Sequence, residues 1–143
     1  MHLTNKWIVI AALAIAGLLL TACQKDHGAH HAEHPAEVEA IPGSDLKKVT
    51  LTERAVERLA LKTEKVREDK SGKVVPYSSL IYDPMGQTWV YTSPTPRTFV
   101  RQKVDVDQIK GDMVYLKDGP PVGTIIASVA VAELYGTEFA VGH

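Results

Sequence analysis

Clusters of turn-forming residues divide the second half of this 143-residue chain into short segments, and this punctuation constrains the fold more than any other feature. Proline or glycine occurs in each cluster, and turns are predicted at 83–86, 93–96, 110–112 and 118–121. The segments between the turns are rich in the aliphatic, β-branched and aromatic residues of strands. They cover residues 74–82, 88–92, 98–106, 113–117 and 124–129. This spacing favours an antiparallel roll or barrel over alternating βαβ units.

The stretch before these segments predicts one short helix between two strands. Residues 48–51 and 61–66 have an extended pattern. Between them, Thr52 is a suitable N-cap with Glu53 in the first helical turn. A capping box of Thr50 with Glu53 is an alternative, so the start of the helix stays open by two residues.

The remaining connections complete the predicted architecture. The polar residues 67–73 are expected to form a loop, and residues 132–135 a final helical turn. We therefore expect residues 47–143 to form a mainly β domain. It is a small antiparallel β-roll or barrel with one or two short helices, preceded by a disordered linker.

Composition excludes several classes of function. The chain has 16 Lys and Arg against 17 Asp and Glu, which leaves no basic surface for a nucleic acid. Residues 47–142 contain no histidine, no glycine-rich phosphate loop and no histidine–glutamate zinc motif. Asp105 and Asp107 alternate with Val104 and Val106, which is typical of the solvated face of a strand. We predict neither an enzyme nor a nucleic-acid partner.

The predicted β domain at 47–143 contains two methionines, which could in principle bind a metal ion. Thioethers are ligands of Cu(I), and Met85 and Met113 could supply them. Methionine more often fills gaps in a core, so we expect both to pack.

The N-terminal segment predicts an export signal. A polar start with one lysine precedes an apolar run at 7–20, which is short for a membrane span but typical of a signal peptide. The run ends in Leu-Thr-Ala-Cys, with the only cysteine at Cys23. These four residues resemble the lipobox of bacterial lipoproteins, which implies a signal peptide at 1–22 and acyl chains on Cys23. An uncleaved N-terminal anchor is the alternative.

Lipidation of Cys23 would determine the cellular location of the β domain. Several acyl chains anchor a protein stably, so we expect the domain on the cell-envelope membrane, facing the periplasm. Gln24 follows the cysteine, and by resemblance to enterobacterial sorting, a residue other than aspartate there favours the outer membrane over the inner.

Residues 23–46 are predicted to be a flexible, lipid-anchored, histidine-rich linker. They contain few large aliphatic side chains and cannot bury enough surface to offset the entropy of ordering. Four histidines follow one another at offsets 0, 3, 4 and 7: His27, His30, His31 and His34. On a helix they would share one face, where imidazoles could bind Cu, Zn or Ni ions. A spacer that binds metal only loosely, or a pH-sensitive tether, remains an alternative.

Two sets of short motifs in the body occur in a characteristic order. The first is VTLTERAVERLALKT at 49–63. The second is the series VPYSSLI (75–81), QTWVY (87–91), FVRQKV (99–104), GDMVYL (111–116) and GPPVG (119–123). Together they resemble the periplasmic adaptor subunits, or membrane fusion proteins, of resistance-nodulation-division efflux pumps. The resemblance implies the adaptors' C-terminal β-barrel and membrane-proximal regions, and it covers most of residues 47–135.

The chain also departs from the adaptors. They carry a lipoyl-like domain and a long α-helical hairpin between the two parts, whereas only residues 67–74 separate the motifs here. The chain is therefore not expected to bridge to an outer-membrane duct. The resemblance covers only the part of the adaptors that packs near the membrane and against the transporter.

These observations predict a lipid-anchored accessory protein of an efflux assembly that acts by protein–protein contact. The partner would be an efflux transporter or a full-length adaptor, and heavy-metal efflux is suggested by analogy with the histidine segment. The candidate partner-binding residues are Trp89, Tyr91, Phe99 and Arg101, although the three aromatic side chains suit a core equally well. The alternatives are an envelope lipoprotein that binds metal through its four histidines and a plain structural lipoprotein.

Overall fold

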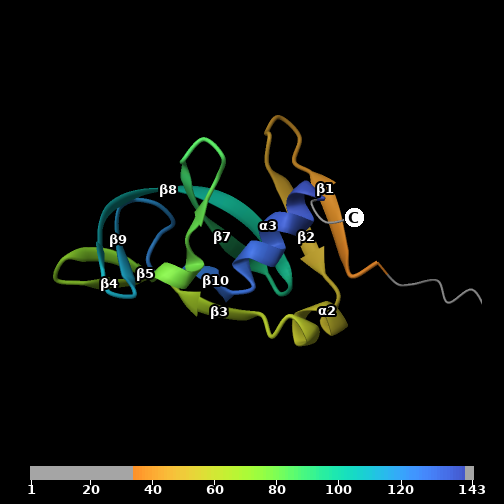
Figure 1. Cartoon of the computed structure of the whole chain (residues 1–143), viewed down its shortest axis with the longest axis horizontal. Helices are drawn as coiled ribbons and strands as arrows, with labels where there is room; N and C mark the ends of the chain where they lie inside the picture. Colours follow the sequence, from red (N-terminus) through yellow and green to blue (C-terminus); the bar gives the residue numbers. More distant parts are fainter. Residues whose placement is uncertain (1–33, 141–143) are drawn as a thin grey trace, which may run out of the picture. The chain divides into compact units, whose positions relative to one another are not determined.

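The computed structural model describes residues 34–140, which form a curled antiparallel half-barrel with two α-helices (Figure 1). The mainly β fold class is thereby confirmed. The strands are β1 Ala36–Ala40, β2 Lys47–Leu51, β3 Lys62–Lys65, β4 Arg67–Asp69, β5 Gly72–Pro76, β6 Ile81–Tyr82, β7 Thr88–Thr95, β8 Thr98–Lys110, β9 Met113–Asp118 and β10 Ile125–Val129. The helices are α2 Glu53–Arg58, the 3₁₀ turn η1 Tyr77–Ser79, and α3 Val131–Phe139.

The long strand β8 organises the sheet. The strand order is β3-β10-β7-β8-β9-β5-β4, with β2 also on β8, β1 on β2 and β6 on β7. The first part of β8 pairs with β7 and β2, and its last part pairs with β9. Register shifts between Asp105 and Gln108 lie where the partners change. Such irregularities bend a strand, which accounts for the curl of the sheet at this point.

The curled sheet has a separate apolar core on each face. One cluster lies with the helices and consists of Val49, Leu51, Ala55, Tyr91, Phe99, Ala127, Val131 and Leu134. The other consists of Val66, Val75, Leu80, Val90, Val104, Val114, Leu116 and Ile126. Successive strand residues point to opposite faces, so neighbours such as Val90 and Tyr91 enter different cores. This explains why β7 is apolar on both faces from Trp89 to Tyr91.

Two local predictions are confirmed in detail. The Oγ1 atom of Thr52 accepts a hydrogen bond from the Ala55 N–H at 3.2 Å, so Thr52 is the N-cap of α2 and Thr50 belongs to β2. The predicted turn at 83–86 closes with a hydrogen bond of 2.9 Å from the Gly86 N–H to the Asp83 carbonyl. Gly86 has φ +77°, a conformation that glycine adopts without strain.

The predicted linker at 23–46 is wrong for its last part. β1 lies within it and pairs antiparallel with β2 over five residue pairs, Val38 opposite Val49 among them. Small and acidic residues alone do not favour a strand, and β1 is ordered because β2 supplies a hydrogen-bonding edge. The ordered domain therefore begins before Lys47.

Other boundaries also differ from the predictions. The expected loop at 67–73 is the β4–β5 hairpin, and the expected strand at 74–82 is interrupted by η1. β7 continues through Ser93 and Pro94 with a register shift, because a bulge tolerates proline in a strand. The expected final turn at 132–135 is the nine-residue helix α3.

Replacing Thr52 with alanine tests the cap of α2. We expect Thr52→Ala to lower the free energy of unfolding by about 1 kcal/mol, because the Ala55 N–H loses its acceptor. Thr52→Ser keeps an acceptor and should stay close to the wild type in chemical denaturation followed by circular dichroism. Equal losses in the two variants would contradict the capping role.

Candidate functional site: a buried arginine–carboxylate cluster under the C-terminal helix

The four predicted partner-binding residues do lie on one face of the sheet. Trp89 and Tyr91 are two residues apart on β7, as are Phe99 and Arg101 on β8. Tyr91 is directly opposite Arg101 in the antiparallel register. Because side chains two residues apart share a face, the structure brings all four together.

This face is not free to dock a partner, because α3 covers it. Tyr91 and Phe99 are fully buried in the core that includes Val131 and Leu134 of α3, and Arg101 is 7% exposed. Trp89 alone keeps partial exposure. The prediction of a docking surface made of these four residues is therefore wrong. The face is covered because Val131 and Leu134 of α3 (Figure 1) belong to the same buried cluster as Tyr91 and Phe99, and because Glu138 of α3 binds Tyr91 and Arg101.

The helix contributes a buried carboxylate to this face. Oε2 of Glu138 accepts hydrogen bonds from the Tyr91 hydroxyl at 2.6 Å and from Arg101 Nε at 2.8 Å. The Glu138 side chain is fully buried, and its Oε1 has no hydrogen-bond partner within the described residues. Burial, and then the hydrogen bond to Glu138, raise the pKa of Tyr91 above its ordinary value. The phenol therefore keeps its proton and donates a hydrogen bond to the carboxylate.

Aromatic rings complete the surroundings of Arg101. The centre of its guanidinium group lies 4.4 Å from the Trp89 ring, 4.9 Å from Phe139 and 5.8 Å from Tyr135. These are distances of cation–π attraction, which is stronger where water is excluded. Lys47 donates a hydrogen bond of 3.1 Å to the Glu138 carbonyl at the end of α3. The cluster thus binds the last helix to both β7 and β8.

Asp83 positions Trp89 from the β6–β7 turn. Its Oδ1 accepts hydrogen bonds from the N–H groups of Met85 and Gln87, and its Oδ2 accepts one from the Trp89 indole at 3.0 Å. Desolvation acts to raise the pKa of Asp83, but the hydrogen bonds from Gln87, Trp89 and Met85 outweigh it. The pKa of Asp83 is therefore lowered.

Sequence reasoning missed Glu138, the central residue of this cluster. The available signal was its spacing, since Val131, Leu134 and Glu138 recur at i, i+3 and i+7 on one helical face. An acidic residue on an apolar face requires a buried cation or donor as partner. Arg101, assigned to a docking surface, is that partner.

Most of the other predicted site residues lie in the part of the chain that the structure does not describe. Cys23, His27, His30 and His31 lie outside the described residues, and His34 is exposed at their start. Between His34 and Ala140, no group of three or more His, Cys, Asp and Glu side chains could hold a metal ion.

Two further expectations concern the methionines and the membrane. Met85 is 79% exposed at the tip of the β6–β7 turn, so the expectation that it packs in the core is wrong. Met113 is partly buried and its sulfur lies 3.9 Å from Arg67. Within 34–140, neither helix has the length and apolar character needed to cross a bilayer.

Comparisons with family models, with curated proteins and with solved structures found no match to this chain.

Breaking the buried ion pair should be costly, whereas replacing both partners should not. Arg101→Leu leaves the Glu138 carboxylate buried without its cation, and we expect a loss of about 3–5 kcal/mol in the free energy of unfolding. The double variant Arg101→Leu/Glu138→Leu removes both charges and should recover most of this loss. Urea denaturation of the wild type, both single variants and the double variant measures the coupling. Losses that simply add would contradict a direct interaction.

The Asp83 turn predicts a pH-dependent contribution to stability. Because the folded state lowers the pKa of Asp83, its carboxylate stabilises the fold fully above the ordinary aspartate value of about 3.9. This stabilisation is lost as the pH falls through the lowered pKa. We expect Asp83→Asn to reduce the melting temperature at pH 7 and to approach the wild type in strong acid. Asp107→Asn, at an exposed position on β8, is the control and should show no such convergence.

Proposed function

We propose that this chain is a lipid-anchored accessory protein of an envelope efflux assembly, and that it acts by protein–protein contact rather than by catalysis. Cys23 would carry the acyl chains, and the β domain would meet a transporter or a full-length adaptor near the membrane surface. The assignment rests on the resemblance of the two sets of motifs to periplasmic adaptors.

The observation that carries the proposal is the joining of these two sets of motifs. The first overlaps β2 and β3, and the second overlaps β7, β8 and β9. β2 pairs with β8 at three positions, and β3 pairs with β10 at the far end of the chain. A chain without the adaptors' long insertion thus still assembles both parts into one sheet. This supports the view that the adaptor-like region works as a module of its own.

The length of the tether supports a site of action close to the bilayer. Cys23 and His34 are eleven residues apart. Even at full extension such a segment spans only about 40 Å. A partner reached from this anchor must therefore present its contact surface close to the membrane.

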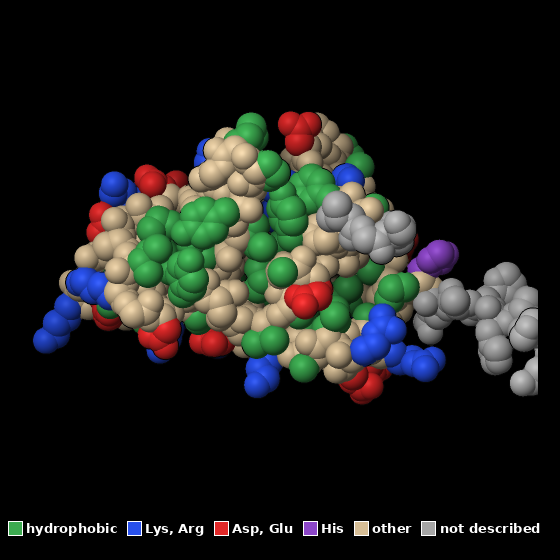
Figure 2. Space-filling view, viewed as in Figure 1, with side chains coloured by type: hydrophobic (Ala, Val, Ile, Leu, Met, Phe, Trp, Pro, Cys, Tyr) green, Lys and Arg blue, Asp and Glu red, His purple; other side chains and the backbone are tan. Residues whose placement is uncertain are grey.

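Any contact must use a surface other than the one covered by α3. Hydrophobic side chains reach the surface along α3 and over the neighbouring η1 region, and charged side chains lie mainly around the edge of this view (Figure 2). Tyr77, Tyr82 and Ile125 are among the exposed apolar residues.

The proposal predicts specific co-purification from native membranes. After brief crosslinking and extraction in mild detergent, full-length protein should enrich an inner-membrane transporter or an adaptor, identified by mass spectrometry. Cys23→Ser should abolish lipidation, release the protein from the membrane and lose this enrichment. The soluble variant controls for contacts formed after lysis.

Recovery of the wild-type protein alone would contradict the accessory role. It would direct attention to the alternative of metal binding through His27, His30, His31 and His34. In that case, Cu(II) or Zn(II) titration of the mature protein should show a site that disappears when all four histidines are replaced by alanine.

A further inference from the structure

A groove lies at the end of the domain where α2 faces the β7–β8 hairpin. Its cavity has a volume of about 300 Å³. The apolar side chains that line it are Val56, Leu61, Pro94, Pro96, Phe99 and Ile125. This volume is at the lower end of the range for ligand sites, and it suits a few side chains better than a large cofactor.

The sheet itself keeps this groove open. β10 pairs with β7 only between Ile126 and Thr92, and the register of β7 against β8 shifts beyond Thr92. The hairpin therefore diverges from β10 at the groove. As a result Ile125 is 43% exposed, although Ile126 and Ala127 beside it are fully buried.

The groove carries a positive charge that no acidic side chain among its described lining residues balances. Arg97 is the single charged side chain among the described residues that line it, and no carboxylate joins it there. Its backbone has φ +63°, and its carbonyl accepts a hydrogen bond of 2.9 Å from the Leu51 N–H. Arg97 forms no salt bridge within residues 34–140. A ligand with an apolar group and a carboxylate would complement both features.

A free strand edge lies beside the groove. Thr63 of β3 contributes to the lining, and β3 pairs only with β10 within the described part of the chain. The outer edge of β3 therefore presents backbone donors and acceptors. Extended peptides bind such edges through main-chain hydrogen bonds, while pockets select their alternate side chains.

The groove also lies at the end of the domain where the tether enters. The Pro35 carbonyl accepts a hydrogen bond of 3.0 Å from the Thr52 N–H at the start of α2. Thr52 follows Leu51, which is bonded to Arg97 on the groove. A tether that joins the domain here brings this end within reach of a membrane-embedded partner.

We propose that the groove binds an extended segment of that partner, in which an aliphatic side chain stands next to an aspartate or glutamate. The aliphatic side chain would lie on Leu61 and Ile125, which are both partly accessible, and the carboxylate would pair with Arg97. This inference rests on the proposed function, because the partner is the membrane assembly named there.

Peptide binding to the full-length protein in lipid nanodiscs tests the groove. The probes are labelled ten-residue peptides with one Leu-Asp pair in a Ser/Thr background, and matching peptides with Leu-Lys. We expect saturable binding of Leu-Asp peptides in fluorescence anisotropy. Ile125→Glu and Arg97→Asp should each weaken it at least tenfold, and Arg97→Asp should bind Leu-Lys peptides better than the wild type does.

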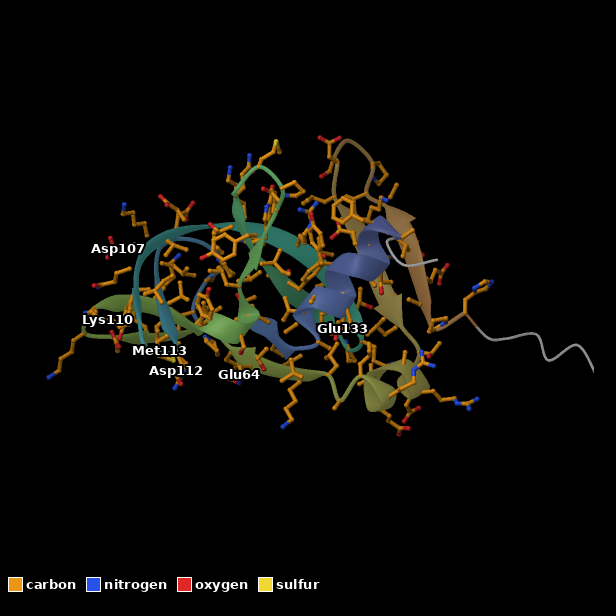
Figure 3. The ribbon with its side chains drawn as sticks, in the orientation of Figure 1. Glu64, Asp107, Lys110, Asp112, Met113 and Glu133 are labelled. Carbon is orange, nitrogen blue, oxygen red and sulfur yellow. The ribbon has the colours of Figure 1, made fainter. Side chains whose placement is uncertain are left out.

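A matched control separates the groove from general surface effects. Ile109→Glu changes an isoleucine that is 46% exposed, close to the 43% of Ile125, and it should leave binding within twofold of the wild type. Ile109 lies between Asp107 and Lys110, which Figure 3 places at the end of the sheet away from α2. Circular dichroism would verify that each variant is folded.

The outcomes distinguish this inference from the proposed function. Absence of peptide binding, or an equal loss in Ile109→Glu, would overturn the groove proposal. Binding of labelled lauric acid that Ile125→Glu abolishes, without peptide binding, would overturn it in favour of an acyl chain. If Ile125→Glu still co-purified with the transporter or adaptor, the accessory role would stand without the groove. If the wild type bound peptides but enriched no membrane partner, the accessory role itself would fail.

Discussion

The ion pair between Glu138 and Arg101 is the interaction on which the arrangement of this domain depends. One carboxylate oxygen accepts hydrogen bonds from Arg101 and Tyr91, and the other has no partner among the described residues. Such a pair adds little net stability compared with apolar packing, but it is costly to break. Its consequence is local, because the pair fixes the end of α3 to side chains of both β7 and β8.

This placement explains why an apolar, aromatic sheet face is not a docking surface. The rings of Trp89 and Phe139 lie over the guanidinium of Arg101, and the carboxylate approaches from the helix. The chain thus supplies its own cover for the face. The cover also leaves part of Trp89 accessible, with its indole held by Asp83 in the adjoining turn.

The geometry of β8 determines where other surfaces are available. Its length lets it pair with β2 and β7 at one end and with β9 at the other, and its bulges curl the sheet between them. The β7–β8 hairpin then separates from β10, which leaves the groove near α2. In this way a domain with a covered sheet face retains an apolar, positively charged recess close to the start of α2.

Several elements followed from the sequence alone because their causes are local. The cap at Thr52, the turn at Asp83 to Gly86 and the strand at Met113–Asp118 depend on nearby side chains, backbone preferences and alternation. The single cysteine, the charge balance and the adaptor-like motifs are likewise properties of the sequence, and they motivate the proposed function.

Other features were decided only by the tertiary structure. β1 is a strand because β2 lies beside it, and α3 extends to Phe139 because its face packs against the sheet. The roles of Glu138 and Arg101 depend on an approach across 37 residues of chain. Composition and periodicity describe what a residue prefers, whereas burial and pairing depend on which distant segment meets it in the fold.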